Sequence, residues 1–315
     1  MSKKTKTNDK IKFLIFFIII AVIAAVPTIF KKANDISFWN ENAQKADIIE
    51  NGDFLNYEVN FHFIDVGQGS CTLITSDYGN ILVDCGEKEN YEHVTDYLEN
   101  LKIKKIDYLI ASHPHSDHIG CMYYIVNKFD IGKFFMPEID ESDIPTSVCY
   151  ERLLESLDKK NVDSSYMKKG DAFQLGEVEC TALAPVEIIK GNLNSMSIIL
   201  KVKYKDISLL LTGDAETDEE KTVLKSGSDI SADILSIAHH GSRTSSSMTF
   251  LKAVSPQIAV ISCAENNKYN HPHTETLDKL KKLGIEIYRT DIESDIIIST
   301  DGEKIVKQQT GDIDE

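Results

Sequence analysis

Ala111-Ser-His-Pro-His-Ser-Asp-His-Ile-Gly120 is the stretch of this chain that says most about its fold. It continues an apolar run, residues 106–112, which predicts a buried strand ending at a loop. A tight loop at the mouth of a strand can aim several imidazole and carboxylate groups at one point, and such groups suit zinc or a similar divalent ion. A His-rich surface loop is the alternative, but three of the nine histidines fall in this window. Four side chains are therefore candidate metal ligands: His113, His115, Asp117 and His118.

Two later segments end in the same kinds of side chain. Residues 209–216 read LLLTGDAE, an apolar strand that ends on Asp214. Residues 234–242 read ILSIAHHGS, a second apolar strand that ends on His239 and His240. Taken alone, the first ending also fits a common turn, and the second fits a hydrogen-bonded core histidine. Three apolar strands that each end in ligand types predict a metal cleft.

The rest of the chain alternates between strand-like and helix-like segments. This alternation predicts an α/β (α+β) fold with mixed sheets rather than a purely parallel one. Two similar halves are possible, although no internal sequence repeat is visible. The expected strands are residues 59–66, 71–75, 80–84, 106–112, 174–183, 197–204, 207–212, 232–238, 257–262, 285–289 and 294–298. The expected helices are residues 91–101, 119–128, 148–160, 215–226 and 273–283.

The N-terminus predicts a membrane anchor. Residues 13–30 carry no charge and would form about 27 Å of helix, close to the thickness of a hydrocarbon core. Five Lys precede this run and two follow it, which favours a single-pass helix with the remainder outside the cytoplasm. A cleaved signal peptide is the alternative. The predicted organisation is a transmembrane helix in residues 1–32, a polar tether in 33–56, a catalytic domain in 57–308 and an acidic tail in 309–315.

Charge and cysteine content limit the function classes. The chain carries −16; its first 32 residues contribute +6, which leaves −22 for the remainder. So acidic a domain repels polyanions, which argues mildly against a nuclease. The six cysteines form no Cys-x-x-Cys pair and are better interpreted as small buried residues than as disulfides.

At this point a family resemblance is visible. The motif His113-x-His115-x-Asp117-His118, preceded by residues 80–86 (NILVDCG) and followed by residues 212–214 (TGD), resembles the metallo-β-lactamase superfamily. Residues 63–69 (FIDVGQG), 238–242 (AHHGS) and 267–272 (NKYNHP) resemble the C-terminal metallohydrolase domain of the DNA-uptake protein ComEC. The likeness covers residues 57 to about 308, without ComEC's multi-spanning channel. It implies an αββα sandwich of two mixed sheets flanked by helices.

The resemblance also implies two divalent ions, zinc or manganese, and a role for each candidate ligand. His113 and His115 would bind the first ion, and Asp117 with His118 the second. Asp214 would bridge the two ions. Either His239 or His240 would complete the second site, and His240 is the preferred ligand, with His239 as a substrate or proton contact.

Other positions take supporting or substrate-contacting roles through the resemblance. Asp84 would orient the ligand loop. His271 would face the cleft as a phosphate contact or acid, or would be a simple turn residue before Pro272. The remaining candidates are Asp65, Asn194, Ser197, Ser242 and Tyr269. His62, His93 and His273 are interpreted as structural.

One departure from the family pattern affects the first metal site. Many members supply a third histidine from the segment between the two main motifs, but residues 119–238 contain none. The matching stretch, residues 192–198 (NLNSMSI), is similar to the Asn/Ser motif of ComEC-like proteins. The first site should therefore hold its metal weakly and favour a harder ion such as manganese. β-Lactamase activity is disfavoured for the same reason.

Three functions are compatible with these residues. The first is a phosphodiesterase or nuclease acting on single-stranded DNA outside the membrane, with Asp117, Asp214, His239 and His271 as catalytic residues. The second is a hydrolase of a small envelope phosphodiester, such as a phosphorylcholine ester, which suits an acidic domain. The third is a non-catalytic, metal-stabilised binding module. The turn at residues 67–69 is too short for a nucleotide fingerprint, so no nucleotide cofactor is expected.

Overall fold

The computed structural model describes residues 48–50 and 57–309. The predicted membrane anchor of residues 1–32 lies outside these residues, as do most of the predicted tether and nearly all of the acidic tail. Within the described part of the chain, no helix has the length and apolar character needed to cross a membrane.

Two mixed β-sheets form the centre of the domain. The first has nine strands in the order β1-β16-β15-β2-β3-β4-β5-β6-β7, with antiparallel pairing from β16 to β4 and parallel pairing from β4 to β7. β1 pairs parallel to β16 at the other edge. The strands are β1 (Ile48–Glu50), β2 (Val59–Phe63), β3 (Thr72–Ser76), β4 (Gly79–Val83), β5 (Lys105–Ile110), β6 (Asp130–Met136), β7 (Asp163–Tyr166), β15 (Ile296–Thr300) and β16 (Ile305–Gln309).

The second sheet repeats this pattern with seven strands. Its order is β14-β13-β12-β11-β10-β9-β8, antiparallel from β8 to β11 and parallel from β11 to β14. Both sheets therefore pass from antiparallel hairpins into three parallel steps, so the domain has two similar halves. The strands are β8 (Ala172–Leu175), β9 (Val178–Ala182), β10 (Leu200–Tyr204), β11 (Ile207–Leu211), β12 (Ile234–Ser236), β13 (Ile258–Ile261) and β14 (Glu286–Arg289).

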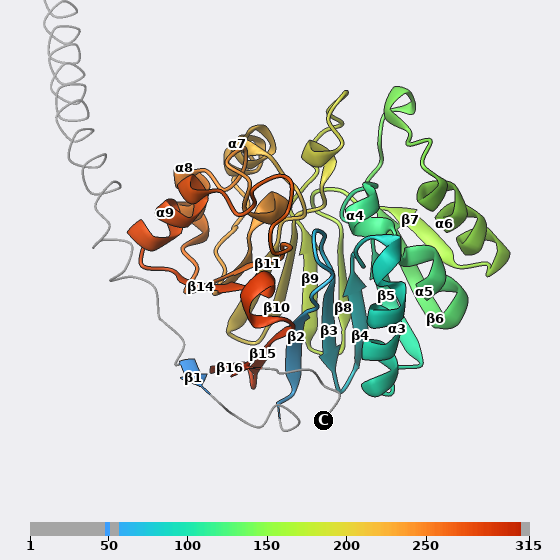
Figure 1. The fold of residues 1–315 in the computed structure, drawn as a ribbon, viewed down its shortest axis with the longest axis horizontal. Coiled ribbons are helices and arrows are strands. Elements are labelled where there is room, and N and C mark those ends of the chain that lie inside the picture. Colours follow the sequence, from blue (N-terminus) through green and yellow to red (C-terminus); the bar gives the residue numbers. More distant parts are fainter. Residues whose placement is uncertain (1–47, 51–56, 310–315) are drawn as a thin grey trace, which may run out of the picture. The chain divides into compact units, whose positions relative to one another are not determined.

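Helices cover the outer face of each sheet (Figure 1). The helices that follow the strands of the first sheet are α3 (Tyr91–Asn100), α4 (Ser116–Ile119), α5 (Met122–Lys128) and α6 (Val148–Lys159). Those of the second sheet are α7 (Thr217–Lys225), α8 (Met248–Val254), α9 (Thr274–Lys282) and α10 (Thr290–Glu293). The predicted arrangement of two mixed sheets flanked by helices is confirmed.

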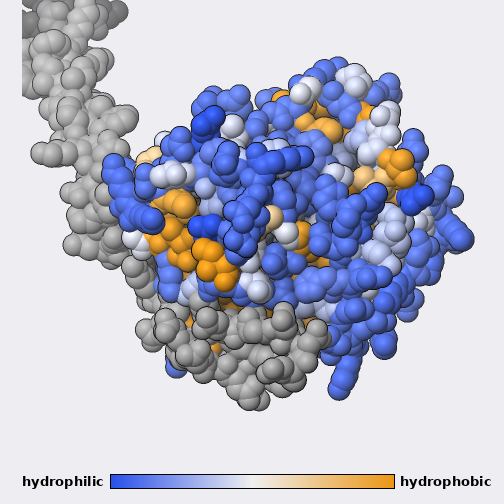
Figure 2. Space-filling model, viewed as in Figure 1, coloured by the Kyte–Doolittle hydropathy of each residue, from blue (hydrophilic) through white to orange (hydrophobic). Residues whose placement is uncertain are grey.

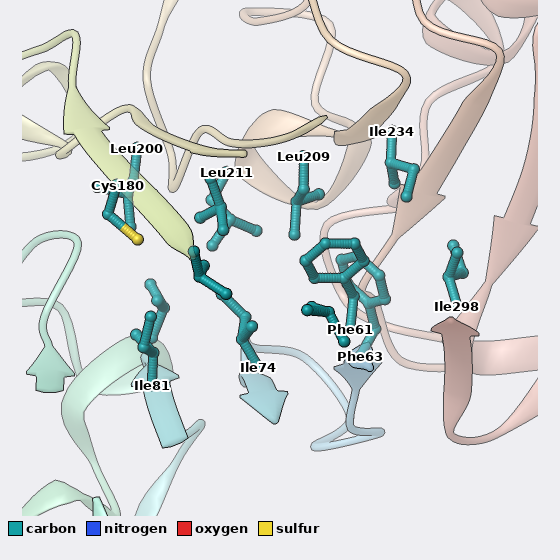
Figure 3. Packing of buried hydrophobic residues seen from close by; sticks show 14 of the residues in the cluster. Phe61, Phe63, Ile74, Ile81, Cys180, Leu200, Leu209, Leu211, Ile234 and Ile298 are labelled. Atoms are coloured by element: carbon teal, nitrogen blue, oxygen red, sulfur yellow. The ribbon is translucent and has the colours of Figure 1, made fainter. Parts of the chain in front are cut away.

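The main hydrophobic core lies between the sheets. Phe61, Phe63 and Ile74 of the first sheet face Leu209 and Leu211 of the second (Figure 3). Side chains alternate along a strand, so the residues between these inward-facing positions point to the outer helices instead. Leu210, for example, belongs to the core beneath the helices of the second sheet. The viewed surface is mainly hydrophilic, with apolar residues confined to small patches (Figure 2).

The sequence-based element assignments need several corrections. The single strand predicted at 174–183 is a hairpin, β8 and β9, which turns at Gly176 with a φ of 59°. The helix predicted at 119–128 is divided into α4 and α5. Gly120 lies at the division, where an added Cβ would stand 2.5 Å from the Lys88 nitrogen. The strand predicted at 59–66 ends at Phe63. The prediction omitted β1, β6, β7, β16, α8 and α10, whose apolar patterns are short or interrupted.

The parallel strands bring the candidate residues to one edge of the sandwich. In parallel strands the carboxyl ends lie at the same edge, where ligands of open α/β sheets commonly bind. β4 and β5 end just before the loops of Asp84 and His113. β11 and β12 end just before Asp214 and His240. The fold therefore gathers ligand-type side chains from both sheets.

The core assignment predicts the cost of a cavity. Leu209→Ala should lower the free energy of unfolding by about 2–5 kcal/mol, because Leu209 is fully buried between the sheets. Leu154→Ala on α6, where the side chain is 41% exposed, should cost less than about 1 kcal/mol. Urea unfolding followed by circular dichroism measures both, and equal losses would contradict the core assignment.

Candidate metal centre

Asp84 organises the loop that carries the predicted ligands. Its carboxylate accepts hydrogen bonds from the Ser112 backbone N–H and the Ser112 hydroxyl, both at 2.7 Å. It also accepts from His118 Nδ1 at 2.7 Å. All three residues are buried. Asp84 therefore fixes the start of the loop and the ring of His118 together, as expected from the sequence.

These hydrogen bonds assign the tautomers of two histidines. A carboxylate only accepts, so Asp84 requires a proton on His118 Nδ1, and in the neutral ring Nε2 is then a lone pair. The single proton of the Ser112 hydroxyl goes to Asp84, so its oxygen accepts from His113 Nδ1 at 3.2 Å. His113 Nε2 is then also a lone pair. The sequence analysis missed Ser112, although it directly precedes the first ligand.

One group of possible ligands contains His113, His115 and Asp214, one ligand atom from each lying within 4.8 Å of the others. His113 Nε2 lies 2.9 Å from His115 Nδ1 and 3.8 Å from Asp214 Oδ2. Burial lowers the pKa of both histidines, and the neighbouring His118 lowers that of His113 further. Neutral imidazole is the form that binds a metal.

The second group contains Asp117, His118, Asp214 and His240, within the same limit. His118 Nε2 lies 3.1 Å from Asp214 Oδ1, and His240 Nε2 lies 3.3 Å from Asp117 Oδ2. His240 Nδ1 donates to the Ser262 carbonyl at 2.9 Å, which leaves Nε2 as the lone pair that faces the carboxylates. Asp214 belongs to both groups.

The electrostatics of the second group are those of a buried charge cluster. Burial opposes ionisation of Asp214, but His118 and His240 outweigh it and hold the Asp214 pKa well below its usual value. Burial likewise lowers the pKa of His118, but Asp214 and Asp84 raise it well above normal. Both shifts favour a positive charge beside the Asp214 carboxylate, which a divalent cation would supply.

A further observation supports a metal site at these residues. His118 Nε2, Asp214 Oδ1 and His240 Nε2 are buried and have no well-aligned hydrogen-bond partner in the described part of the chain. Such orphaned atoms are rare in native proteins and need an explanation. Here all three converge on one point, which divalent-cation binding explains.

The paired histidines after β12 have different positions. Both have a positive φ, 53° at His239 and 54° at His240, in a turn held by the His239 N–H donating to the Gly213 carbonyl at 3.0 Å. His240 thereby enters the second group, whereas His239 lies at its margin, 22% exposed, with Nε2 3.7 Å from Asp214 Oδ2. His239 Nδ1 lies 3.6 Å from Glu216 Oε1, a neighbour that the sequence analysis missed.

His271 lies beside this cluster. Its ring centroid is 5.6 Å from that of His239 and 6.2 Å from that of His240. Burial and these two histidines lower the pKa of His271 to about 4. Tyr269 stacks on the His271 ring at 5.6 Å but is 49% exposed, so it belongs to the rim. His273 packs on the opposite edge of His271 at 4.9 Å.

The other predicted residues have supporting positions. The Ser197 hydroxyl accepts from the Asp214 N–H at 2.9 Å and so holds the bridging candidate in place. Asn194 lies on the same turn, η4 (Asn194–Met196), and its buried Oδ1 has no hydrogen-bond partner among the described residues. Ser242 accepts from the Thr244 N–H within a turn. Asp65 accepts from the Gly67 N–H at 3.0 Å and belongs to neither ligand group.

The cysteines were predicted to be small buried residues rather than disulfides, and the structure agrees. All six are free, and five are buried. His62 is also structural: it is buried, and burial lowers its pKa to about 4.

Comparison with known protein families agrees with this geometry. The family described as "Metallo-beta-lactamase superfamily" matches residues 64–265. Among curated proteins, "ComE operon protein 3" of Bacillus subtilis is 29% identical over 255 residues, which cover 75% of this chain and 32% of that protein. "Competence protein ComA" of Neisseria gonorrhoeae is 31% identical over 232 residues, which cover 72% of this chain and 30% of that protein. The chain thus spans about a third of the length of these relatives.

Solved structures show the same fold. The metallo-beta-lactamase fold protein YhfI from Bacillus subtilis matches with a TM-score of 0.51 at 16% identity, over 76% of this chain and 98% of that one. CmlA, a diiron beta-hydroxylase from Streptomyces venezuelae, matches with a TM-score of 0.54 at 16% identity, over 78% of this chain and 54% of that one. At these identities the likeness extends to the fold alone.

The role of Asp84 predicts a loss of metal affinity. In Asp84→Asn, an amide N–H would face the Nδ1–H of His118, so the ring would lose its orientation. Affinity for zinc should fall about 10- to 100-fold, as is usual when a partner of a metal-binding histidine is removed. Competition with a chromophoric chelator measures the change. Asp229→Asn, at a side chain that is 75% exposed, is the control, and equal affinities would contradict the assignment.

The two overlapping ligand groups predict different metal contents for two variants. Asp214→Ala removes the ligand common to both groups and should abolish stable binding of both ions. His115→Ala alters only the first group and should leave one ion per chain. Elemental analysis after gel filtration gives the stoichiometry. One ion bound by Asp214→Ala would show that the two groups do not share this residue.

Proposed function

Because the chain belongs to the metallo-β-lactamase superfamily, we propose that residues 57–308 form a binuclear, metal-dependent phosphodiesterase that cleaves single-stranded DNA. The observation that carries the proposal is the convergence of three orphaned buried atoms, on His118, Asp214 and His240, beside two further histidines. Zinc or manganese is the proposed metal. We also propose that residues 1–32 anchor the domain outside the cytoplasm, as the charges around residues 13–30 favour.

The chemistry divides between bound ions and this chain's own residues. Two divalent ions would supply an activated water and neutralise the phosphoryl oxygens. Asp117 and Asp214 would hold the ions and orient the water. His239 is partly exposed at the margin of the cluster, where it can contact a leaving oxygen. His271 lies on the same side of the cluster.

DNA as the substrate rests on the resemblance to ComEC and on a relative named "Competence protein ComA". Similarity of fold and name is an associational argument, because a fold hosts many functions. The charge of −22 outside the first 32 residues favours a small phosphodiester instead. The two substrates must therefore be separated by experiment.

The test uses the full-length chain in mild detergent, loaded in turn with zinc and with manganese. Single-stranded DNA and bis-p-nitrophenyl phosphate should both be cleaved. Asp117→Ala and Asp214→Ala should each lower the rate at least about 100-fold, because several kcal/mol of transition-state stabilisation is lost. Asp229→Ala, at an exposed position away from the cluster, is the matched control.

Three other outcomes would each lead to a different conclusion. Cleavage of the small ester alone would reject DNA and favour a small phosphodiester substrate. Metal binding without turnover of either substrate would indicate a metal-stabilised binding module. Turnover that survives both substitutions would exclude the cluster as the catalytic site.

A further inference from the structure

The turn at residues 67–69 (Gly-Gln-Gly) has no part in the proposed chemistry. It nevertheless lies against the loop of residues 113–118, which carries the predicted metal ligands. The Ser70 N–H, directly after the turn, donates to the Asp117 carbonyl at 3.1 Å. Gly69 allows this approach, because a Cβ there would stand 2.5 Å from the same carbonyl oxygen. One end of the turn is thus fixed to a predicted metal ligand.

The other end of the turn contacts the loop of His271. Gln68 Oε1 accepts from the Ala264 N–H at 3.4 Å, and Gln68 Nε2 lies 3.4 Å from His271 Nδ1. A backbone N–H only donates, so it fixes which end of the Gln68 amide is oxygen. The NH₂ end must then face His271. Because an NH₂ group only donates, His271 Nδ1 accepts, and the ring proton lies on Nε2.

The loop that carries His271 is held together by the side chain of Asn267. The Asn267 side chain accepts from the backbone N–H groups of Tyr269 and His271, at 3.1 and 3.0 Å. It also donates to the carbonyls of Ala264 and His271, at 2.9 and 2.5 Å. One side chain therefore ties together both residues that Gln68 contacts. The motif of residues 267–272 is explained by this internal bonding.

We infer that Gln68 is a positioning residue that holds His271 as the Nε2–H tautomer, so that His271 offers a hydrogen-bond donor to a phosphodiester oxygen in the cleft. The inference rests on the proposed function for its substrate, but the tautomer follows from the contacts of this chain. It makes His271 a donor rather than a base or a metal ligand. It also gives the turn a function: the turn joins the metal-binding loop to the donor.

The first test measures the tautomer without any activity. Ring ¹⁵N shifts of histidine-labelled full-length chain report which nitrogen is protonated, and His271→Gln identifies the His271 signals by their loss. At a pH where the ring is neutral, wild-type His271 should be protonated on Nε2 only. In Gln68→Glu the carboxylate can only accept, so Nδ1 should become protonated. Protonated Nδ1 in the wild type, or an unchanged Nδ1 signal in Gln68→Glu, would overturn the inference.

The second test asks whether Gln68 acts through His271. Gln68→Met removes the donor at similar volume and should lower kcat on bis-p-nitrophenyl phosphate on the order of 10- to 100-fold, with metal content unchanged. In the His271→Gln background the same change should cost little more, because the two residues act as a unit. Fully additive losses would reject the positioning role. Gln174→Met, at an exposed position on β8, is the control and should change neither readout.

These two tests separate the inference from the proposed function. If the chain proves inactive on every phosphodiester, the proposed function fails while the ¹⁵N measurement still decides the tautomer. If the chain is active but Nδ1 carries the proton, the function stands and the role of Gln68 is rejected.

Discussion

The site depends on the burial of one carboxylate, that of Asp214. It is 3% exposed, and an isolated charge at such a position would cost several kcal/mol. A divalent cation beside Asp214 would offset this cost, and three predicted ligand histidines have ring nitrogens 3.1–3.8 Å from the carboxylate: His113, His118 and His240. These histidines lie in loops after different strands, β5 and β12, so the ligand set is complete only when both halves of the sandwich have come together. Asp214 thus lies where ligand side chains from the two sheets meet.

Three of the four predicted ligand histidines are held by a partner on the outer nitrogen. Ser112 accepts from His113, Asp84 from His118, and the Ser262 carbonyl from His240. In each case the partner is an acceptor, so in the neutral ring the inner Nε2 is a lone pair directed at the cluster. His271 is the exception, because its outer nitrogen meets the NH₂ group of Gln68, a donor. The partner on the outer nitrogen therefore decides what the inner nitrogen can do: His113, His118 and His240 can bind a cation, whereas His271 can donate to an anion.

The parts of the site that the sequence predicts are those whose residues lie close together along the chain. The ligands from His113 to His118 lie within six residues, so the motif itself predicts a metal site. The apolar runs before Asp214 and His240 predict strands, and parallel pairing then brings their ends together. The contact between Gln68 and His271 spans 203 residues and leaves no local pattern. Strand β7 was equally hard to predict, because its residues are largely exposed and show no apolar alternation.

The acidic net charge of the chain argues against DNA as a substrate less strongly than its size suggests. Charges beyond about 8–10 Å are largely screened at physiological ionic strength, so the local charge governs the bound phosphate. Locally, two divalent ions would contribute +4, which offsets the −4 of Asp84, Asp117, Asp214 and Glu216. The loaded site would therefore be near neutral rather than acidic, and its ions could bind one phosphodiester group although the surrounding surface repels a long polyanion. Such a balance favours cleavage at a chain end or in a short strand over tight binding to duplex DNA, because few phosphates would contact the protein at once.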